Sequence, residues 1–218
     1  MFLKKTLCVF IVFIRIQCTG RIDKLTAYCK IIRTCTTDNN AASRFFTENP
    51  GLSHDKIVLY LPTFRERDAY IAEQLKVEFR DVDGYRLIIS AHPLFSKIKI
   101  ENEFSYSGDF STYDLMKIAD VIITDYSACA FEASVLMKPL YFFVPDYDEY
   151  SSERGINVDL KNEMPSATFE NAEVLVNASK LNNYDFDMLY KFKCEYVENT
   201  KANNAEILAK FVSMLLKA

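Results

Sequence analysis

Glycine is scarce in this chain, which has only 5 glycines among its 218 residues. So few glycines argue against a many-turned barrel and against a glycine-rich phosphate loop. An excess of one charge is also missing, because 26 basic residues face 30 acidic ones and leave a net charge of -4. This mild acidity gives no general attraction for nucleic acid or anionic lipid, although it leaves room for local basic patches.

Cysteine pairs with metal-binding or redox spacing are absent as well. None of the six cysteines forms a CxxC pair, and the two histidines, His54 and His92, stand far apart in sequence. We therefore expect neither a zinc site nor a redox pair, and no cofactor. His54 is expected to be a solvated loop residue. Scattered cysteines in a chain of this length are typical of small buried hydrophobic residues in a reducing compartment; they are Cys8, Cys18, Cys29, Cys35, Cys129 and Cys194.

The apolar run nearest the N-terminus is too short to cross a membrane as a helix. It extends from Leu7 to Ile14 and is ended by Arg15, whereas a membrane span needs about 20 apolar residues. Lys4 and Lys5 precede it, and a basic start before an apolar run resembles a signal peptide, but the small-residue cleavage pattern is missing. A buried strand or the remnant of a longer protein is the favoured interpretation, with an export signal as the alternative.

The overall composition is that of a globular protein, with 50% hydrophobic and 26% charged residues. It excludes a disordered chain, a collagen-like chain and a coiled coil. Residues 1–55 lack sustained periodicity and end near a turn signal, Asn49-Pro50-Gly51. We therefore divide the chain into a poorly specified N-terminal segment, 1–55, interpreted as a remnant of a preceding domain, and a Rossmann-like domain with C-terminal helices, 56–218.

From residue 56 onward, short apolar runs alternate with stretches of helical spacing. The runs predict buried parallel strands at 57–61, 85–90, 120–124 and 140–144. The helical stretches are 68–80, 113–119, 127–137, 170–180, 186–198 and 202–217. Strands that alternate with helices predict an α/β fold, a Rossmann-like parallel sheet flanked by helices.

In such sheets ligands bind beyond the carboxyl ends of the strands, and the segment Thr124-Asp125-Tyr126-Ser127 is the sharpest candidate there. A helix N-terminus offers unpaired N–H groups and about half a positive charge, which favours a phosphate. Ser127 can add a hydroxyl donor. Asp125 would repel a phosphate, so we expect it to point into the turn. Simple capping of the helix by Ser127 and Asp125 is an equally good interpretation, and both roles can hold at once.

His92 and Glu132 are further candidates near the same edge. His92 follows an expected strand and can accept a proton from an attacking hydroxyl. A hydrogen-bonded structural histidine is the slightly favoured alternative. Glu132 lies five residues past Ser127, where it either accepts hydrogen bonds from ribose hydroxyls or faces solvent.

Thr63 and Arg65 stand at the exit of the first strand. An arginine there suits a phosphate, since its guanidinium can bind two oxygens at once. The alternative is a surface ion pair with Glu66 or Asp68. The aromatic run 141–143 is interpreted as core strand rather than as a platform for base stacking.

A set of short motifs occurs in a fixed order between residues 56 and 180. They are Leu59-Tyr60-Leu61-Pro62-Thr63-Phe64-Arg65, His92-Pro93, Asp114-Leu115-Met116, the stretch from Ala119 to Ser127, Phe131-Glu132, Lys138-Pro139-Leu140, Asp146, Glu149-Tyr150 and Arg154-Gly155. In order and spacing they resemble the CDP-glycerol glycerophosphotransferase family of bacterial teichoic acid synthesis. The resemblance implies the C-terminal, nucleotide-binding half of a two-domain GT-B fold.

The resemblance also implies an activity and a set of contacts. Glycerol phosphate, or a related polyol phosphate, would pass from a CDP-activated donor to a growing teichoic-acid-type polymer, and CMP would leave. The turn at 124–127 would hold the pyrophosphate of the donor and Glu132 would lie by the ribose. His92 matches a histidine implicated in catalysis. The acceptor would be lipid-linked, which places the protein in the cytoplasm at the inner face of the membrane, with peripheral contact and no nucleic acid partner.

Two other functions stay open at this point. Residues 195–200 lack the Asp-Gly pair that usually precedes the family's last helix, and residues 1–55 are too short for the family's preceding domain. One alternative is therefore a truncated module that binds CDP without turnover. The other is a GT-B transferase that uses a nucleotide sugar.

Overall fold

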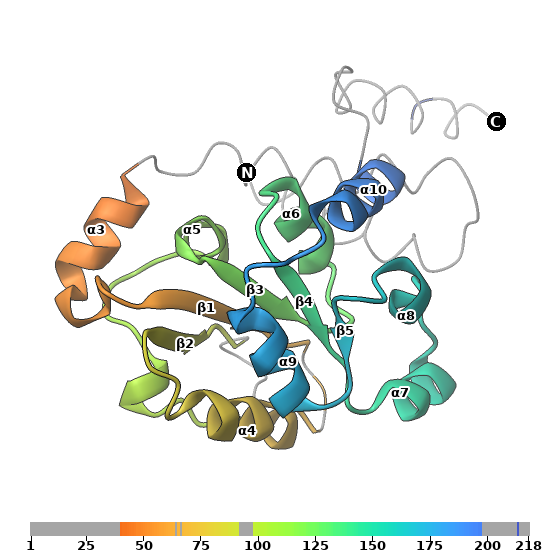
Figure 1. Cartoon of the computed structure of the whole chain (residues 1–218), viewed down its shortest axis with the longest axis horizontal. Coiled ribbons are helices and arrows are strands. Elements are labelled where there is room, and N and C mark those ends of the chain that lie inside the picture. The colour runs from red at the N-terminus through yellow and green to blue at the C-terminus, as the bar shows by residue number, and fades with distance from the viewer. Residues whose placement is uncertain (1–39, 64, 66, 92–97, 198–212, 214–218) are drawn as a thin grey trace.

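A computed structural model describes residues 40–63, 65, 67–91, 98–197 and 213 (Figure 1). Its centre is a five-stranded sheet in the order β2-β1-β3-β4-β5, in which every neighbouring pair is parallel. The strands are β1 (Lys56–Leu61), β2 (Tyr85–Ile89), β3 (Val121–Thr124), β4 (Leu140–Phe143) and β5 (Thr168–Phe169). Because all are parallel, their carboxyl ends share one edge of the sheet, which we call the carboxyl edge.

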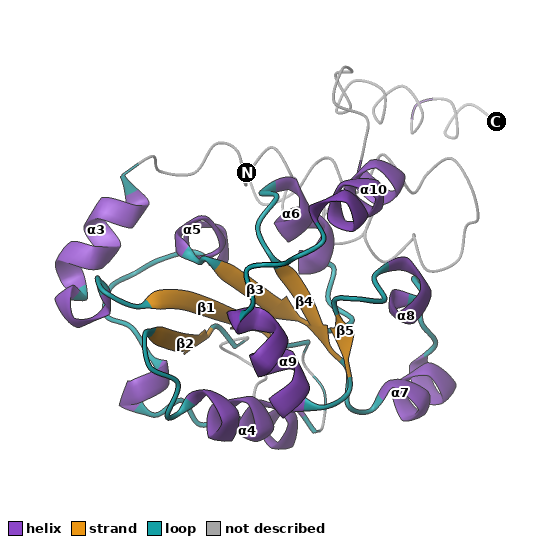
Figure 2. Cartoon of the chain, in the orientation of Figure 1, coloured by secondary structure: helices purple, strands orange, loops and turns teal. Residues whose placement is uncertain are grey.

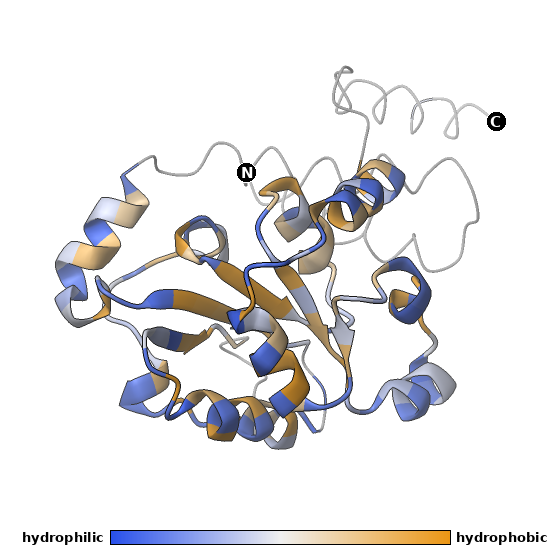
Figure 3. Cartoon of the chain, in the orientation of Figure 1, coloured by the Kyte–Doolittle hydropathy of each residue, from blue (hydrophilic) through white to orange (hydrophobic). Residues whose placement is uncertain are grey.

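The strands form where the sequence has continuous apolar runs. Every residue of β3 and β4 is buried, and β1 exposes only Lys56. Burial of both faces is the reason that these runs do not alternate with polar residues. Figure 3 shows the resulting hydrophobic band through the middle of the molecule. The aromatic run 141–143 lies wholly within the core, as predicted.

Helices cover the sheet on both sides (Figure 2). One face carries α4 (Asp68–Phe79) and α9 (Ala172–Lys180), which contact each other. The other face carries α5 (Thr112–Ile118), α6 (Cys129–Val135) and α10 (Phe186–Val197). The remaining elements are α3 (Ala41–Glu48), η1 (Pro50–Leu52), η2 (Asn102–Phe104), α7 (Tyr147–Arg154) and α8 (Leu160–Glu163). None of the helices in the described ranges is both long and apolar enough to cross a membrane.

The predicted strands and helices between residues 56 and 198 agree with the structure to within two residues at most ends. The helix expected at 202–217 lies outside the described residues, as do residues 1–39 with Cys8, Cys18, Cys29 and Cys35. Cys129 and Cys194 are free thiols of intermediate exposure, less buried than predicted. His54 is exposed, as predicted.

Helix α3 is a feature that the sequence analysis did not predict. Phe45 on this helix has no exposed surface, and its ring lies 5.3 Å from that of Phe110. In the described part of the chain the core therefore begins at Ala41, upstream of the boundary drawn at residue 56. Only two residues of α3 are buried and no side chain caps its start, so its sequence signal is weak. The division of the chain into two domains stays a prediction.

Candidate functional site

The order of the strands reverses at β1, because β2 lies on one side of it and β3 on the other. In open parallel sheets a ligand crevice forms at the carboxyl edge of such a switch point. The loop from Pro62 to Arg67 leaves β1 there, and the turn that begins with Asp125 leaves β3. The residues predicted from sequence therefore stand on both sides of the switch point.

Asp125 connects these two loops. Its carboxylate accepts the main-chain N–H of Thr63 at 3.0 and 3.1 Å, the Thr63 hydroxyl at 2.5 Å, and Nη2 of Arg65 at 3.0 Å. Asp125 is 1% exposed, and this burial raises its pKa against the opposing effect of Arg65. It thus points inward as expected, but toward the neighbouring loop instead of capping its own helix. The N-cap of α6 is Ala128 and no side chain caps it there, but Ser127 Oγ accepts the N–H of Cys129, the first residue of the helix, at 3.3 Å.

Arg65 is buried at the switch point, where its guanidinium binds two carboxylates. Nη1 donates to both oxygens of Asp146 at 2.9 and 2.8 Å, while Nη2 is taken by Asp125. The alternative of a surface ion pair with Asp68 is wrong, and Glu66 lies outside the described residues. The sequence suggested neighbours along the chain, whereas folding brings partners from 60 and 81 positions away. With both terminal nitrogens engaged, Arg65 positions loops instead of presenting a fork to a phosphate.

Asp146 and two tyrosines extend this cluster to the exit of β4. Tyr126 Oη donates to Asp146 Oδ1 at 3.2 Å. The ring of Tyr126 stacks on that of Tyr150, with centroids 3.7 Å apart and planes 9° apart. Burial raises the pKa of the Tyr126 phenol, and Asp146 raises it further, so this phenol stays protonated. Arg65, Asp125, Asp146, Tyr126 and Tyr150 together are called the carboxyl-edge cluster below.

Thr124 and Glu132 are both buried. Thr124 has no exposed surface, and its Oγ1 donates to the carbonyl of Leu61 at 2.8 Å, so it links β3 to β1. The prediction that its side chain contacts substrate is not supported by this geometry, because the hydroxyl serves the sheet. Glu132 is 3% exposed, which excludes the alternative that it faces solvent. His92 lies outside the described residues.

The turn between β3 and α6 keeps donor groups available. Residues 126–129 are partly exposed. Within the described residues, no hydrogen bond occupies the main-chain N–H groups of Tyr126, Ser127 or Ala128. The arrangement can thus offer several N–H donors to an anion, while the cluster behind them fixes the backbone.

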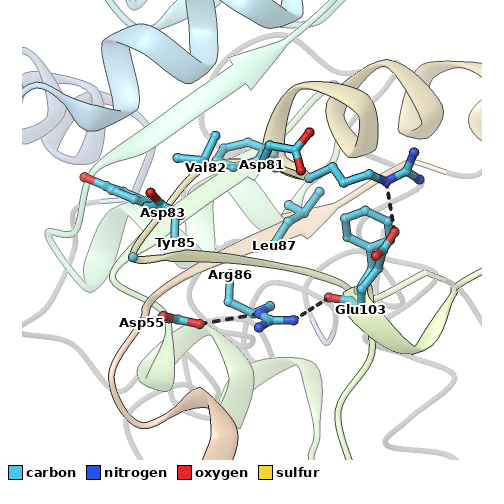
Figure 4. A pocket seen from close by; sticks show the side chains of 12 residues that line it. Asp55, Asp81, Val82, Asp83, Tyr85, Arg86, Leu87 and Glu103 are labelled. Carbon is cyan, nitrogen blue, oxygen red and sulfur yellow. Dashed lines mark hydrogen bonds and ion pairs between the residues drawn. The ribbon is translucent and has the colours of Figure 1, made fainter.

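A cavity of about 360 Å³ lies at the opposite edge of the sheet and contains none of the predicted site residues (Figure 4). Most of the charged residues that line this cavity form ion pairs with one another. Arg86 pairs with Asp55 at 3.5 Å, and Arg80 pairs with Glu103 at 3.1 Å. The strands begin here, so the cavity is at the edge of the sheet where open α/β folds do not usually bind ligands.

Three residues that belong to the motif set, but to which the sequence assigned no individual contact, have clear structural partners. Asp146 and Tyr150 follow β4 at the same edge as the predicted loops, and that position was the available signal. Lys138 has a structural function, because its Nζ donates to the main-chain carbonyls of Lys117 and Ala119 and so satisfies the end of α5. Burial lowers the pKa of Lys138.

Comparison with curated proteins finds relatives in teichoic acid synthesis. Teichoic acid ribitol-phosphate primase of Bacillus spizizenii is 32% identical over 185 residues, which cover 79% of this chain and 47% of that protein. Teichoic acid glycerol-phosphate primase of Bacillus subtilis is 29% identical over 176 residues, covering 76% of this chain and 45% of that protein. The chain therefore spans less than half the length of these two relatives.

Comparison with solved structures finds the wall teichoic acid polymerase TagF. One TagF structure has a TM-score of 0.57 and 22% identity, and the match covers 86% of this chain and 51% of that chain. This likeness confirms the predicted fold class, a Rossmann-like parallel sheet resembling half of a GT-B fold. The family model of CDP-Glycerol:Poly(glycerophosphate) glycerophosphotransferase matches residues 33–214. This chain belongs to the CDP-glycerol:poly(glycerophosphate) glycerophosphotransferase family.

Proposed function

We propose that this chain binds the donor nucleotide in a transferase that moves glycerol phosphate, or a related polyol phosphate, from a CDP-activated donor to a growing teichoic-acid-type polymer. Its membership of the family, through a match over residues 33–214, carries this proposal. The relatives, named as teichoic acid primases and polymerases, support the same class of reaction.

The proposed donor site is the turn at the carboxyl edge. The pyrophosphate would take the N–H groups at 126–128 and the Ser127 hydroxyl, with Glu132 toward the ribose. Thr63, Arg65, Thr124 and Asp125 would act from behind, because their hydrogen bonds hold the loops that form the crevice. A preformed set of donors is advantageous for phosphoryl transfer, since little reorganisation is needed as charge develops.

The proposed reaction balances without a cofactor. A terminal hydroxyl of the acceptor forms a bond to the β-phosphorus, the bond between that phosphorus and the bridging oxygen breaks, and CMP leaves with the bridging oxygen. His92 would take the proton of the attacking hydroxyl. We further propose that the acceptor is linked to a lipid. The protein would then act at the inner, cytoplasmic face of the membrane, through peripheral contact.

Release of CMP tests this proposal directly. The chain is incubated with CDP-glycerol, or with CDP-ribitol, and a lipid-linked polyol-phosphate primer. CMP production that depends on both substrates is the expected result. CDP binding without CMP release would support the alternative of a binding module without turnover. Turnover with nucleotide sugars, and none with CDP-polyols, would favour the other GT-B alternative and contradict the proposal.

A further inference from the structure

Arg65, the cation at the centre of the carboxyl-edge cluster, is bound to two protein carboxylates. Arg65 donates to Asp146 at 2.8 and 2.9 Å and to Asp125 at 3.0 Å. One guanidinium therefore faces two protein carboxylates. A donor diphosphate brings more negative charge to the same edge. A further cation beside the turn would favour binding of this charge.

Two other arginines flank this cluster, and they differ in their partners. Arg67 forms an ion pair with Glu149, so its charge is balanced within the protein. Arg154 is exposed at the last position of α7, and across the described ranges no carboxylate lies within ion-pair distance of it. Its guanidinium carbon lies 5.8 Å from the ring centroid of Tyr150.

A column of side chains connects Arg154 to the proposed phosphate turn. Tyr150 lies one helical turn before Arg154, and its ring stacks on Tyr126 at 3.7 Å. Tyr126 immediately precedes Ser127, so its main chain belongs to the proposed phosphate turn. Gly155, with φ of +73°, ends α7 directly after Arg154, which is exposed.

We propose that Arg154 is the phosphate-binding cation of this site and that its guanidinium contacts the diphosphate of the bound donor. This inference rests on the proposed function and adds a binding residue to it. The ring of Tyr150 lies beside the guanidinium of Arg154, and an arginine in such a position can bind phosphate oxygens in pairs. Arg65, which is the arginine nearest the switch point, keeps the loops in place instead.

Calorimetric titration of matched variants with CDP and with cytidine tests the inference. Arg154→Gln removes the charge and keeps a polar side chain, and Arg67→Gln does the same to the paired arginine at the same edge. Loss of a charge-assisted hydrogen bond typically weakens binding by about 10- to 100-fold. We expect this loss for CDP with Arg154→Gln, a change of less than about threefold with Arg67→Gln, and partial recovery with Arg154→Lys.

Cytidine separates a phosphate contact from a structural effect. Because cytidine lacks phosphates, its affinity should be the same for Arg154→Gln and the unmodified chain. Unchanged CDP affinity in Arg154→Gln would overturn the inference and leave the proposed function standing. Equal losses for CDP and cytidine would also overturn it, since Arg154 would then act through Tyr150 or the fold. If the unmodified chain binds no CDP, both the inference and the proposed donor site fail.

Discussion

Arg65 and Asp146 stand 81 positions apart in the sequence, yet Nη1 of the arginine donates to both oxygens of the carboxylate at 2.9 and 2.8 Å. Arg65 follows β1 and Asp146 follows β4, so the pair bridges the loop that leaves the intervening strand β3. Asp125 on that loop takes the other terminal nitrogen of Arg65. Three loops are thereby fixed against one another without any ligand, which is the kind of preorganisation that phosphoryl transfer requires.

Removing one carboxylate from this arrangement should destabilise the fold. Asp146→Asn leaves the buried Arg65 with less charge compensation, and breaking a buried pair in this way typically costs about 3 kcal/mol. The free energy of unfolding in urea measures the effect. Glu103→Gln is the control, because it breaks an ion pair with Arg80 in which both side chains are 45% exposed. This variant should lose no more than about 1 kcal/mol of unfolding free energy. Equal losses in the two variants would contradict the structural role of the buried pair.

Replacing Tyr60 by phenylalanine is not expected to destabilise the fold. The Tyr60 side chain has no exposed surface, and its hydroxyl lies close to Arg65 but, within the described residues, meets no partner in hydrogen-bond geometry. A buried hydroxyl without a partner costs about 1–3 kcal/mol. Tyr60→Phe removes that hydroxyl and keeps the ring, so the unfolding free energy should stay the same or rise. A loss of more than about 1 kcal/mol would show that the hydroxyl has a stabilising partner.

Tyr141 should make the stability of the fold depend on pH in the alkaline range. Burial raises the pKa of Tyr141 to about 12, whereas the unfolded phenol titrates near about 10. Between these values the folded chain keeps a proton that the unfolded chain has lost, so stability should fall as pH rises. Urea unfolding at about pH 9 and about pH 11 measures the slope. Tyr141→Phe lacks this proton and should show a shallower decline; identical slopes would contradict the assignment.

Ser127 should affect the affinity for CDP more than the fold. Ser127→Ala removes the hydroxyl donor of the proposed phosphate turn, and loss of one hydrogen bond to a charged group weakens binding by about tenfold or more. The variant also removes the hydrogen bond to the N–H of Cys129, so its stability is measured separately. Ser152→Ala removes an exposed hydroxyl on α7 that bonds to the carbonyl of Glu149 and should bind CDP normally. Normal binding by Ser127→Ala would remove this residue from the site.

His92 is expected to act in the chemical step and not in binding of the donor. His92→Ala should bind CDP with the affinity of the unmodified chain and should release no CMP in the presence of an acceptor. His54→Ala, which alters an exposed residue at the other edge of the sheet, should leave both properties unchanged. Normal turnover by His92→Ala would show that this histidine is not the base.

Much of the fold could be predicted from the sequence because its signals are local. The buried runs that form β1, β3 and β4 are continuous and apolar, and each is followed by a stretch of helical spacing. Elements with few buried residues have weak local signals, and the sequence did not predict them. Helix α3 buries only Ala41 and Phe45, and β5 has only two residues.

The position of the candidate site could be predicted from the sequence, but the hydrogen-bond partners of its side chains could not. The rule for open sheets selects the loops after β1, β3 and β4 from the sequence alone. The partners of a side chain within that edge depend on the packing of distant segments. No local pattern could show that Arg65 would meet Asp125 and Asp146, or that the Thr124 hydroxyl would be used by the carbonyl of Leu61.

We expect the carboxyl edge of the sheet, and not its opposite edge, to bind a cytidine diphosphate group. Hydrogen–deuterium exchange of the whole chain with and without saturating CDP measures this most directly. Slower exchange in peptides that span 122–130 and 144–154, with no change in peptides that span 79–87 beside the cavity of Figure 4, is the predicted result. Protection confined to 79–87, or no protection in any peptide, would show that CDP does not bind at the carboxyl edge.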